Sequence, residues 1–99
     1  MSPYLLTWPA AADLRAIVSY VQEQDGVDRA LHVYDALVRG FEFVASSPNA
    51  GFQKRHADLG VVRWWPVFSF LIVYDPTTSP VEILRISHAA QDFFSGVDQ

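Results

Sequence analysis

The chain of 99 residues contains no cysteine and only one methionine. Without cysteine, neither a disulfide framework nor a thiolate metal site is available, which suits a reducing compartment. No apolar run approaches the ~20 residues of a membrane-spanning helix. Residues 1–9 also lack the basic start and long apolar core of a signal peptide. We therefore expect a cytoplasmic protein with no membrane partner.

Positive charge is also scarce. Seven Lys and Arg residues stand against eleven Asp and Glu, which gives a net charge of −4 and a pI near 5.1. This balance has the wrong sign for a wide phosphate-binding surface, so we expect no direct sequence-specific binding of nucleic acid. With 51% hydrophobic and 18% charged residues, the chain is typical of a folded protein. Its length predicts one domain over residues 1–99.

Motifs that carry common chemistries are missing as well. There is no GxSxG, no glycine-rich phosphate loop and no HExxH. The histidines His32, His56 and His88 do not have the spacing of metal ligands, so we expect neither a metal nor another cofactor. Ser87 adjoins His88, but a nucleophile and its base are seldom neighbours in sequence.

The residues that are present indicate strands in the second half. Phe68–Tyr74 and Val81–Ser87 are rich in β-branched, aromatic and aliphatic side chains, and the breaker cluster 75–80 separates them. A third strand is expected over Val61–Trp65, ended by Pro66. Short connections make these three an antiparallel meander. The middle run is apolar on both faces and should be central, and alternation in the last strand places Leu84 and Ile86 in the core.

The first half indicates an edge strand and two helices. Residues 4–7 form a short apolar run, and Thr7 is the expected N-cap of a helix over residues 10–24. Gly26 interrupts the helical pattern, and Asp28 is the expected cap of a second helix that ends at residues 46–51. Gly40 inside this helix suggests close packing. The apolar stripe of the second helix consists of Leu31, Tyr34, Leu37, Val38, Phe41 and Val44.

These elements predict an α+β fold. Two helices joined by about four residues run antiparallel, and each has a wide apolar face. The central strand offers a matching surface. We therefore expect an N-terminal strand and an αα hairpin packed on a small antiparallel sheet that contains the three-stranded meander.

Six cationic side chains cluster by sequence around the predicted sheet: Lys54, Arg55, His56, Arg63, Arg85 and His88. Two interpretations stay open for them. Structural roles, such as stacking of Arg63 on an aromatic ring or pairing of Arg85 with a carboxylate, explain most residues of this kind. A shallow polar face that contacts an acidic partner or nucleic acid is the functional interpretation.

A succession of residues extends over nearly the whole chain. It runs through Ala12-Asp13-Leu14-x-x-Ile17-x-x-Tyr20, then Ala30 to Leu37, Phe41 and Pro48-x-x-Gly51, then Arg63-x-x-Pro66-Val67-x-x-Phe70-Leu-Ile-x-Tyr74, and Val81-x-Ile83-Leu-Arg85-Ile-x-His88-x-x-x-Asp92. In order and spacing it resembles the ParE branch of the RelE/ParE toxins of type II toxin–antitoxin systems. The fold that this resemblance implies agrees with the one above.

The resemblance implies one of two activities. RelE-like members cleave mRNA on the ribosome with basic side chains. They place an Arg at the position of Leu71, lysines at or near Val62 and Trp64, and another Arg near Ala89. All four positions are apolar here. An aliphatic side chain cannot stabilise charge on a scissile phosphate, so we expect a protein that is not an enzyme and has no catalytic residue.

The resemblance to ParE-like members instead implies an inhibitor of DNA gyrase that acts by binding. The resemblance suggests the C-terminal region as the contact with the target, although Gln91 stands where a basic residue is common. The target-binding candidates are Arg63, Arg85, His88, Asp92, Phe93 and Phe94. A ParD-like antitoxin with a ribbon-helix-helix DNA-binding domain would neutralise the toxin. The residues of this chain that are candidates for binding the antitoxin are Trp8, Tyr20, Tyr34 and Trp64.

Two alternatives to a gyrase inhibitor stay open. One is a ribosome-dependent mRNA endoribonuclease with a displaced constellation of Arg55, Arg63, Arg85 and His88. The other is a toxin-derived module that has lost toxicity and still binds an antitoxin.

Overall fold

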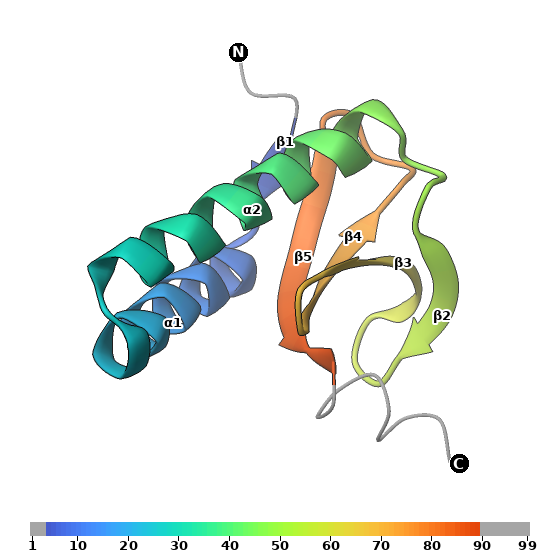
Figure 1. Cartoon of the computed structure of the whole chain (residues 1–99). Coiled ribbons are helices and arrows are strands. Elements are labelled where there is room, and N and C mark those ends of the chain that lie inside the picture. Colours follow the sequence, from blue (N-terminus) through green and yellow to red (C-terminus); the bar gives the residue numbers. More distant parts are fainter. Residues whose placement is uncertain (1–3, 90–99) are drawn as a thin grey trace.

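The computed structural model describes residues 4–89 as two helices and five strands (Figure 1). Along the chain these are β1 (Tyr4–Leu6), α1 (Trp8–Asp25), α2 (Val27–Ser46), β2 (Phe52–His56), β3 (Gly60–Val67), β4 (Phe70–Asp75) and β5 (Val81–His88). The strands form one sheet in the order β1-β5-β4-β3-β2. The predicted α+β class is confirmed.

The sheet is built around the predicted meander. β3, β4 and β5 pair antiparallel in sequence order, and β4 lies in the centre as expected. β1 lies at one edge and runs parallel to β5, with Tyr4 opposite Val81, so the sheet is mixed and not purely antiparallel. β2, which pairs with β3 at the other edge, was not predicted. Its sequence, FQKRH, has no apolar alternation because it is an exposed edge strand.

The predicted boundary between β3 and β4 was wrong. β3 continues through Pro66 to Val67, and the connection is the two-residue turn Phe68–Ser69. Pro66 is tolerated because its nitrogen points away from β4, and β2 pairs with β3 only as far as Trp64. Phe68 therefore belongs to the turn and not to the strand.

A β-bulge changes the alternation in β5. Tyr74 pairs with Ile83, whereas Val73 pairs with Arg85, so Leu84 is the extra residue. Ile83 and Ile86 both face the helices. Leu84 packs on the opposite face, so the prediction that it shares a face with Ile86 was wrong.

Both helix starts have identifiable causes. The Thr7 hydroxyl accepts a hydrogen bond from the Ala10 backbone N–H, as predicted for an N-cap, and also donates to β5 carbonyls. α2 begins directly after Gly26, whose φ of 91° is a conformation that glycine adopts without steric cost. Asp28 lies inside the first turn of α2 and is not its cap, so that prediction was wrong.

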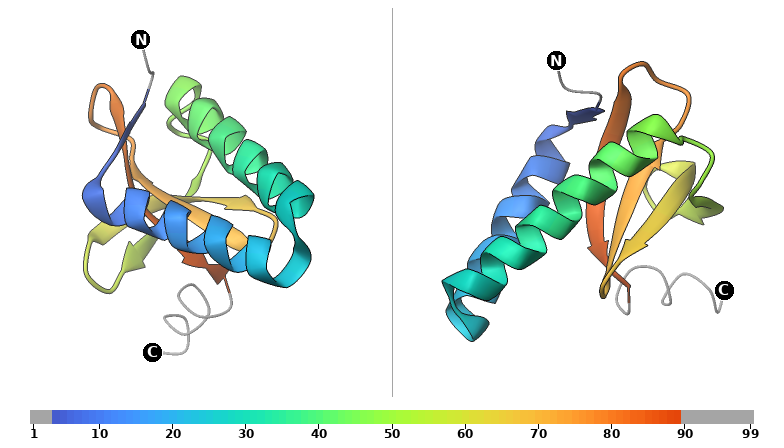
Figure 2. Two further views of the ribbon diagram at one scale, coloured as in Figure 1. Left: turned by 90° about the vertical axis from the view of Figure 1, so that its left-hand side faces the viewer. Right: turned by 45° about the horizontal axis from the view of Figure 1, so that its top comes forward.

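The helical hairpin covers one face of the sheet, and the two layers enclose the main core (Figure 2). Of the buried residues of α2, Ala30, Val33 and Gly40 lie outside the predicted stripe, whereas the other half, namely Leu37, Phe41 and Val44, belong to it. They pack with side chains of the central and neighbouring strands, among them Ile72, Tyr74, Val81, Ile83 and Ile86. Leu31 and Tyr34 of that stripe are exposed, because the packed face of α2 runs through Ala30, Val33 and Leu37, so the prediction was wrong for these two residues.

Gly40 brings α2 close to the sheet. A Cβ atom at this position would lie 2.6 Å from Ile72 Cδ1 and 2.9 Å from Val67 Cγ2. These distances are well inside van der Waals contact, so only glycine allows this separation. The predicted close packing at Gly40 is confirmed.

We predict that Gly40→Ala destabilises the fold by about 1 kcal/mol, the middle of a range of roughly 0–2 kcal/mol. Overpacking a core typically costs 1–3 kcal/mol, and the better helix propensity of alanine returns about 1. Urea unfolding followed by circular dichroism measures the change. Ser19→Ala on the exposed side of α1 is the control and should not destabilise. A Gly40→Ala protein more stable than the wild type would contradict the close approach.

Candidate functional site

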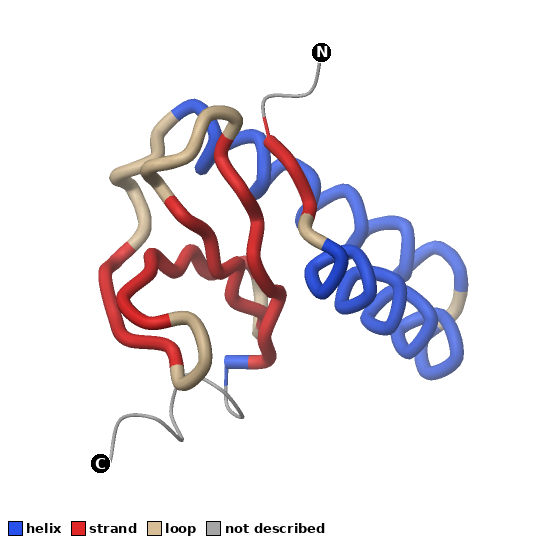
Figure 3. Tube along the Cα trace, turned by 180° about the vertical axis from the view of Figure 1, so that it is seen from behind, coloured by secondary structure: helices blue, strands red, loops and turns tan. Residues whose placement is uncertain are grey.

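The sheet face opposite the helices carries a second apolar cluster. Val62, Trp64, Leu71 and Val73 are buried there, with Leu84 and Ala89 packed against them. Seen from behind, neither α1 nor α2 lies over this face (Figure 3). Lys54 Nζ lies 5.5 Å from the centre of the Trp64 ring, and the His56 ring stacks on it at 5.6 Å.

This cluster occupies the place that the family resemblance assigns to a nuclease site. The four positions at which ribonuclease members carry cationic groups are those of Val62, Trp64, Leu71 and Ala89. The fold brings all four together as packed apolar side chains. The side chains at these four positions are themselves aliphatic or aromatic and do not supply the cations that the ribonuclease members carry there.

The endoribonuclease alternative requires Arg55, Arg63, Arg85 and His88 to lie together. In the fold these four residues do not form one cluster. Arg55 lies on β2 opposite Val61, whereas His88 lies at the far end of β5 opposite Phe70. With three strand spacings across the sheet and about six residues along it, their backbones are roughly 25 Å apart. The His88 ring packs edge-on against Phe70. Arg63 and Arg85, described next, both hold structural positions.

Arg63 and Tyr74 fix the loop between α2 and β2. Arg63 donates to the Gly51 and Asn49 carbonyls. The buried Tyr74 hydroxyl donates to the Pro48 carbonyl at 2.7 Å and accepts from the Gly51 N–H at 2.9 Å. Burial raises the pKa of Tyr74 above its ordinary value of 10.0, against the smaller lowering effects of the Gly51 hydrogen bond and the Arg63 charge.

We predict that Tyr74→Phe costs about 1–3 kcal/mol at pH 8, because two buried backbone groups lose their partner. The wild-type protein should lose stability as pH rises above about 10. Its unfolded state then releases the Tyr74 proton before the folded state does. The difference between the two proteins should therefore shrink between pH 8 and pH 10.5.

Urea unfolding at both pH values tests this prediction. Tyr20→Phe is the control, because Tyr20 lies exposed on α1, and it should change stability at neither pH. A constant difference between Tyr74→Phe and the wild type would contradict the proposed linkage.

Arg85 is held by α1. Its Nε and Nη2 donate to the two carboxylate oxygens of Asp13 at 2.8 and 2.9 Å. The same carboxylate accepts the Ile86 backbone N–H at 2.9 Å, so it covers the edge of β5 beyond the end of β1. This triple contact ties α1 to the sheet. Arg85 therefore has a structural role, which is one of the two interpretations that the sequence left open.

We predict that Asp13→Ala destabilises the protein by about 2–3 kcal/mol and Asp13→Asn by less. Asparagine keeps an acceptor for Ile86, whereas alanine leaves that N–H without one. The Arg85 side chain is 42% exposed, so the coupling energy of a double-mutant cycle with Arg85→Ala should be at most about 1 kcal/mol. Urea unfolding measures all variants, with Asp35→Ala on the exposed side of α2 as control. An Asp13→Ala change below 0.5 kcal/mol would refute the assignment.

A groove of about 740 Å³ opens between the helical hairpin and one end of the sheet. α1 and the first turns of α2 form one wall, and the β3–β4 turn with the start of β4 and the end of β5 forms the other. The apolar part of its lining consists of Ala16, Ile17, Tyr20, Val21, Val33, Phe68, Phe70 and Ile86. The polar part consists of Asp13, Asp25, Arg29, Ser69, Arg85, Ser87 and His88. The lining is thus about half apolar and half polar, and concave surfaces of this size are typical binding sites.

Phe68 at the mouth of the groove has an unusual conformation. Two-residue hairpin turns require a positive φ, which glycine or asparagine normally supplies. Here Phe68 has a φ of 55°, at a cost of about 1–2 kcal/mol for a residue with a Cβ. Its side chain is 55% exposed. It contacts two residues of α2, the Arg29 guanidinium at 5.3 Å and the His32 ring at 5.6 Å.

The predicted antitoxin-binding residues divide into surface and core. Trp8 is 86% exposed at the start of α1, and Tyr20 and Tyr34 are exposed on the hairpin. Trp64 is only 1% exposed, so it cannot present its ring to a partner, and that prediction was wrong. Sequence reasoning missed Phe68, which it placed in a strand. The sequence feature that could have identified Phe68 is an aromatic residue in a connection that is long enough only for a turn.

Of the predicted target-binding residues, His88 is exposed, whereas Arg63 and Arg85 are engaged as described above. Asp92, Phe93 and Phe94 lie outside the described residues. Over residues 4–89, no helix is both long and apolar enough to cross a membrane.

A helical hairpin on one face of a five-stranded sheet defines a small α+β domain. A solved structure from the chromosomal ParDE TA system from P. aeruginosa has this fold, with a TM-score of 0.71 and 25% identity, over 86% of this chain and 92% of that one. No curated protein is a significant match. The family model for the ParE toxin of the type II toxin–antitoxin system parDE matches residues 4–93. The chain belongs to this family, as the resemblance in its sequence predicted.

Proposed function

We propose that this ParE-family toxin arrests growth by binding DNA gyrase and has no catalytic activity of its own. The observation that supports a binding mode of action is the second apolar cluster. Buried Val62, Trp64 and Leu71, with Ala89 beside them, stand where a ribonuclease of the related branch carries its charged groups. A protein without those groups can still act by occupying a partner and stabilising one of its states.

A cognate antitoxin is the second partner in this proposal. The similar solved structure comes from a system that pairs a toxin with its antitoxin. The exposed aromatic side chains of the hairpin and the apolar groove offer surface for such a partner, since exposed apolar patches of this kind mark interaction sites. Antitoxin segments that fold on binding suit long grooves.

The endoribonuclease alternative is the weaker one. Its four residues lie on three strands, with Arg85 and His88 both on β5, and two of them are engaged in structural contacts. The non-toxic module is a further alternative, which growth measurements distinguish from a toxin.

The decisive experiment adds the purified toxin to gyrase and relaxed plasmid. We expect loss of supercoiling and an increase in linear DNA after detergent and protease treatment, because a bound toxin stabilises the cleaved state. Toxin mixed beforehand with the antitoxin from the neighbouring reading frame is the control and should have no effect. In parallel, translating ribosomes with added toxin should keep their mRNA intact.

Two results would contradict the proposal. Gyrase that remains active in excess toxin, with mRNA cuts that disappear in His88→Ala, would favour the endoribonuclease. Normal growth of several hosts that express the toxin alone, with normal binding of the antitoxin, would favour the non-toxic module.

A further inference from the structure

The turn residue Phe68 combines two properties that a purely structural residue seldom has. Its backbone has a positive φ that glycine would adopt without steric cost. Its ring is nevertheless more than half exposed, so burial in the core does not compensate for the strain. Strained residues of this kind concentrate at functional sites, where the surroundings hold them in place.

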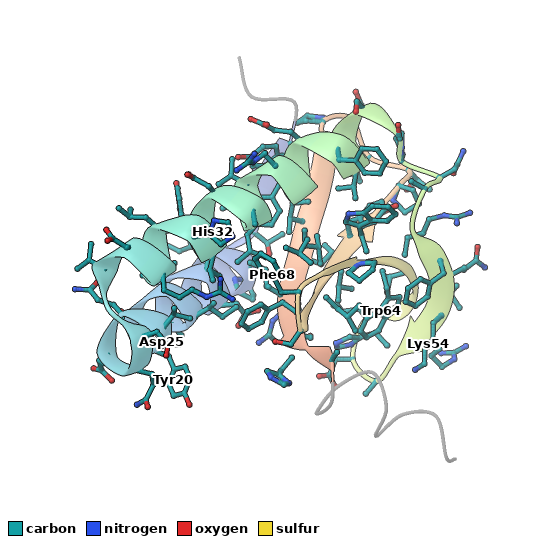
Figure 4. The ribbon with its side chains drawn as sticks, viewed as in Figure 1. Tyr20, Asp25, His32, Lys54, Trp64 and Phe68 are labelled. Atoms are coloured by element: carbon teal, nitrogen blue, oxygen red, sulfur yellow. The ribbon has the colours of Figure 1, made fainter. Side chains whose placement is uncertain are left out.

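The surroundings of Phe68 hold the ring at the mouth of the groove. Arg29 lies over one side of it, and His32 contacts it from the same helix. Figure 4 shows Phe68 and His32 on facing sides of the space between α2 and the sheet, with Tyr20 and Asp25 further out towards the closed end of the hairpin. The ring is thus oriented before any partner arrives, and rigid aromatic side chains of this type are common binding hot spots.

The charge next to the Phe68 ring is positive, whereas the helices around it carry more acidic than basic side chains. Residues 8–46, which include both helices, carry six acidic and three basic side chains. At Phe68 the cation of Arg29 lies directly over the ring. A complementary partner therefore places an apolar side chain against Phe68 and a carboxylate next to it.

We propose that Phe68 is the anchor by which the toxin recognises its antitoxin, through an apolar antitoxin side chain that enters the groove beside Phe68 and an adjacent carboxylate that meets Arg29. This inference rests on the proposed function, because it requires that an antitoxin exists. It adds the residue, the place and the chemistry of the contact.

The test compares folding stability with affinity for the antitoxin encoded by the neighbouring reading frame. Phe68→Gly should melt at the same temperature as the wild type or higher, because the strain disappears. It should nevertheless bind the antitoxin at least 30-fold more weakly. Phe68→Tyr keeps the ring and should bind within threefold of the wild type. Val61→Ala, at a residue that is also 55% exposed but lies at the other end of β3, is the control and should change neither quantity.

The charge part of the proposal has its own pair of variants. Arg29→Glu should weaken binding about tenfold and make it less sensitive to salt. Arg39→Glu, on the exposed surface of the same helix and outside the groove lining, should leave affinity within twofold.

The results separate this inference from the proposed function. A wild-type toxin that does not bind the antitoxin refutes the antitoxin part of the proposed function. A wild type that binds, with Phe68→Gly binding equally well, refutes the anchor alone. Phe68→Gly that loses stability in proportion to its loss of affinity, while Phe68→Tyr restores both, also refutes the anchor, because Phe68 is then a structural residue.

Discussion

The packing of α2 against the central strand is the interaction on which the rest of the structure depends. Leu37 and Phe41 of α2 and Ile72 and Tyr74 of β4 are buried completely between the two layers. Burial of each side chain of this size contributes about 1.5–3 kcal/mol, which is large beside the net stability of a small domain. The contact requires the close approach at Gly40. Once α2 lies on the sheet, the hairpin places α1 beside β5, where Asp13 ties it.

The sheet has a different use on each of its two faces. One face carries the helices, and the other carries the cluster around Trp64. In this molecule the second face consists of packed apolar side chains, so the charged residues nearby have become structural. Arg63 holds a loop, Arg85 holds a helix and Lys54 lies over an indole ring. Each of these three cations therefore has a contact within the fold.

Local signals in the sequence predicted much of this fold. The Thr7 cap, the break at Gly26, the C-terminal half of the α2 stripe and the meander follow from short-range patterns, and all are present. β2 could not be predicted, because an exposed edge strand needs no apolar alternation. The bulge at Leu84 could not be predicted either, since a single extra residue leaves no mark in composition.

The candidate site was predicted less well than the fold. Long-range partners decide whether a cation or an aromatic residue is available, and no local pattern reports them. Asp13 meets Arg85 and Gly51 meets Arg63 only after the chain has folded. Trp64 and Trp8 look alike in the sequence, yet one is buried and the other almost entirely exposed. Phe68 became visible as a candidate only through its backbone conformation.

The pairing of β1 with β5 also has a consequence for the growing chain. Tyr4 emerges from the ribosome among the first residues, but its partner Val81 is among the later ones. At about 5–20 residues per second, several seconds separate the two, and the sheet cannot close during that time. The Thr7 cap shares this delay, since its hydroxyl also contacts the Ile83 and Leu84 carbonyls. The nascent chain therefore lacks its finished sheet for most of its synthesis.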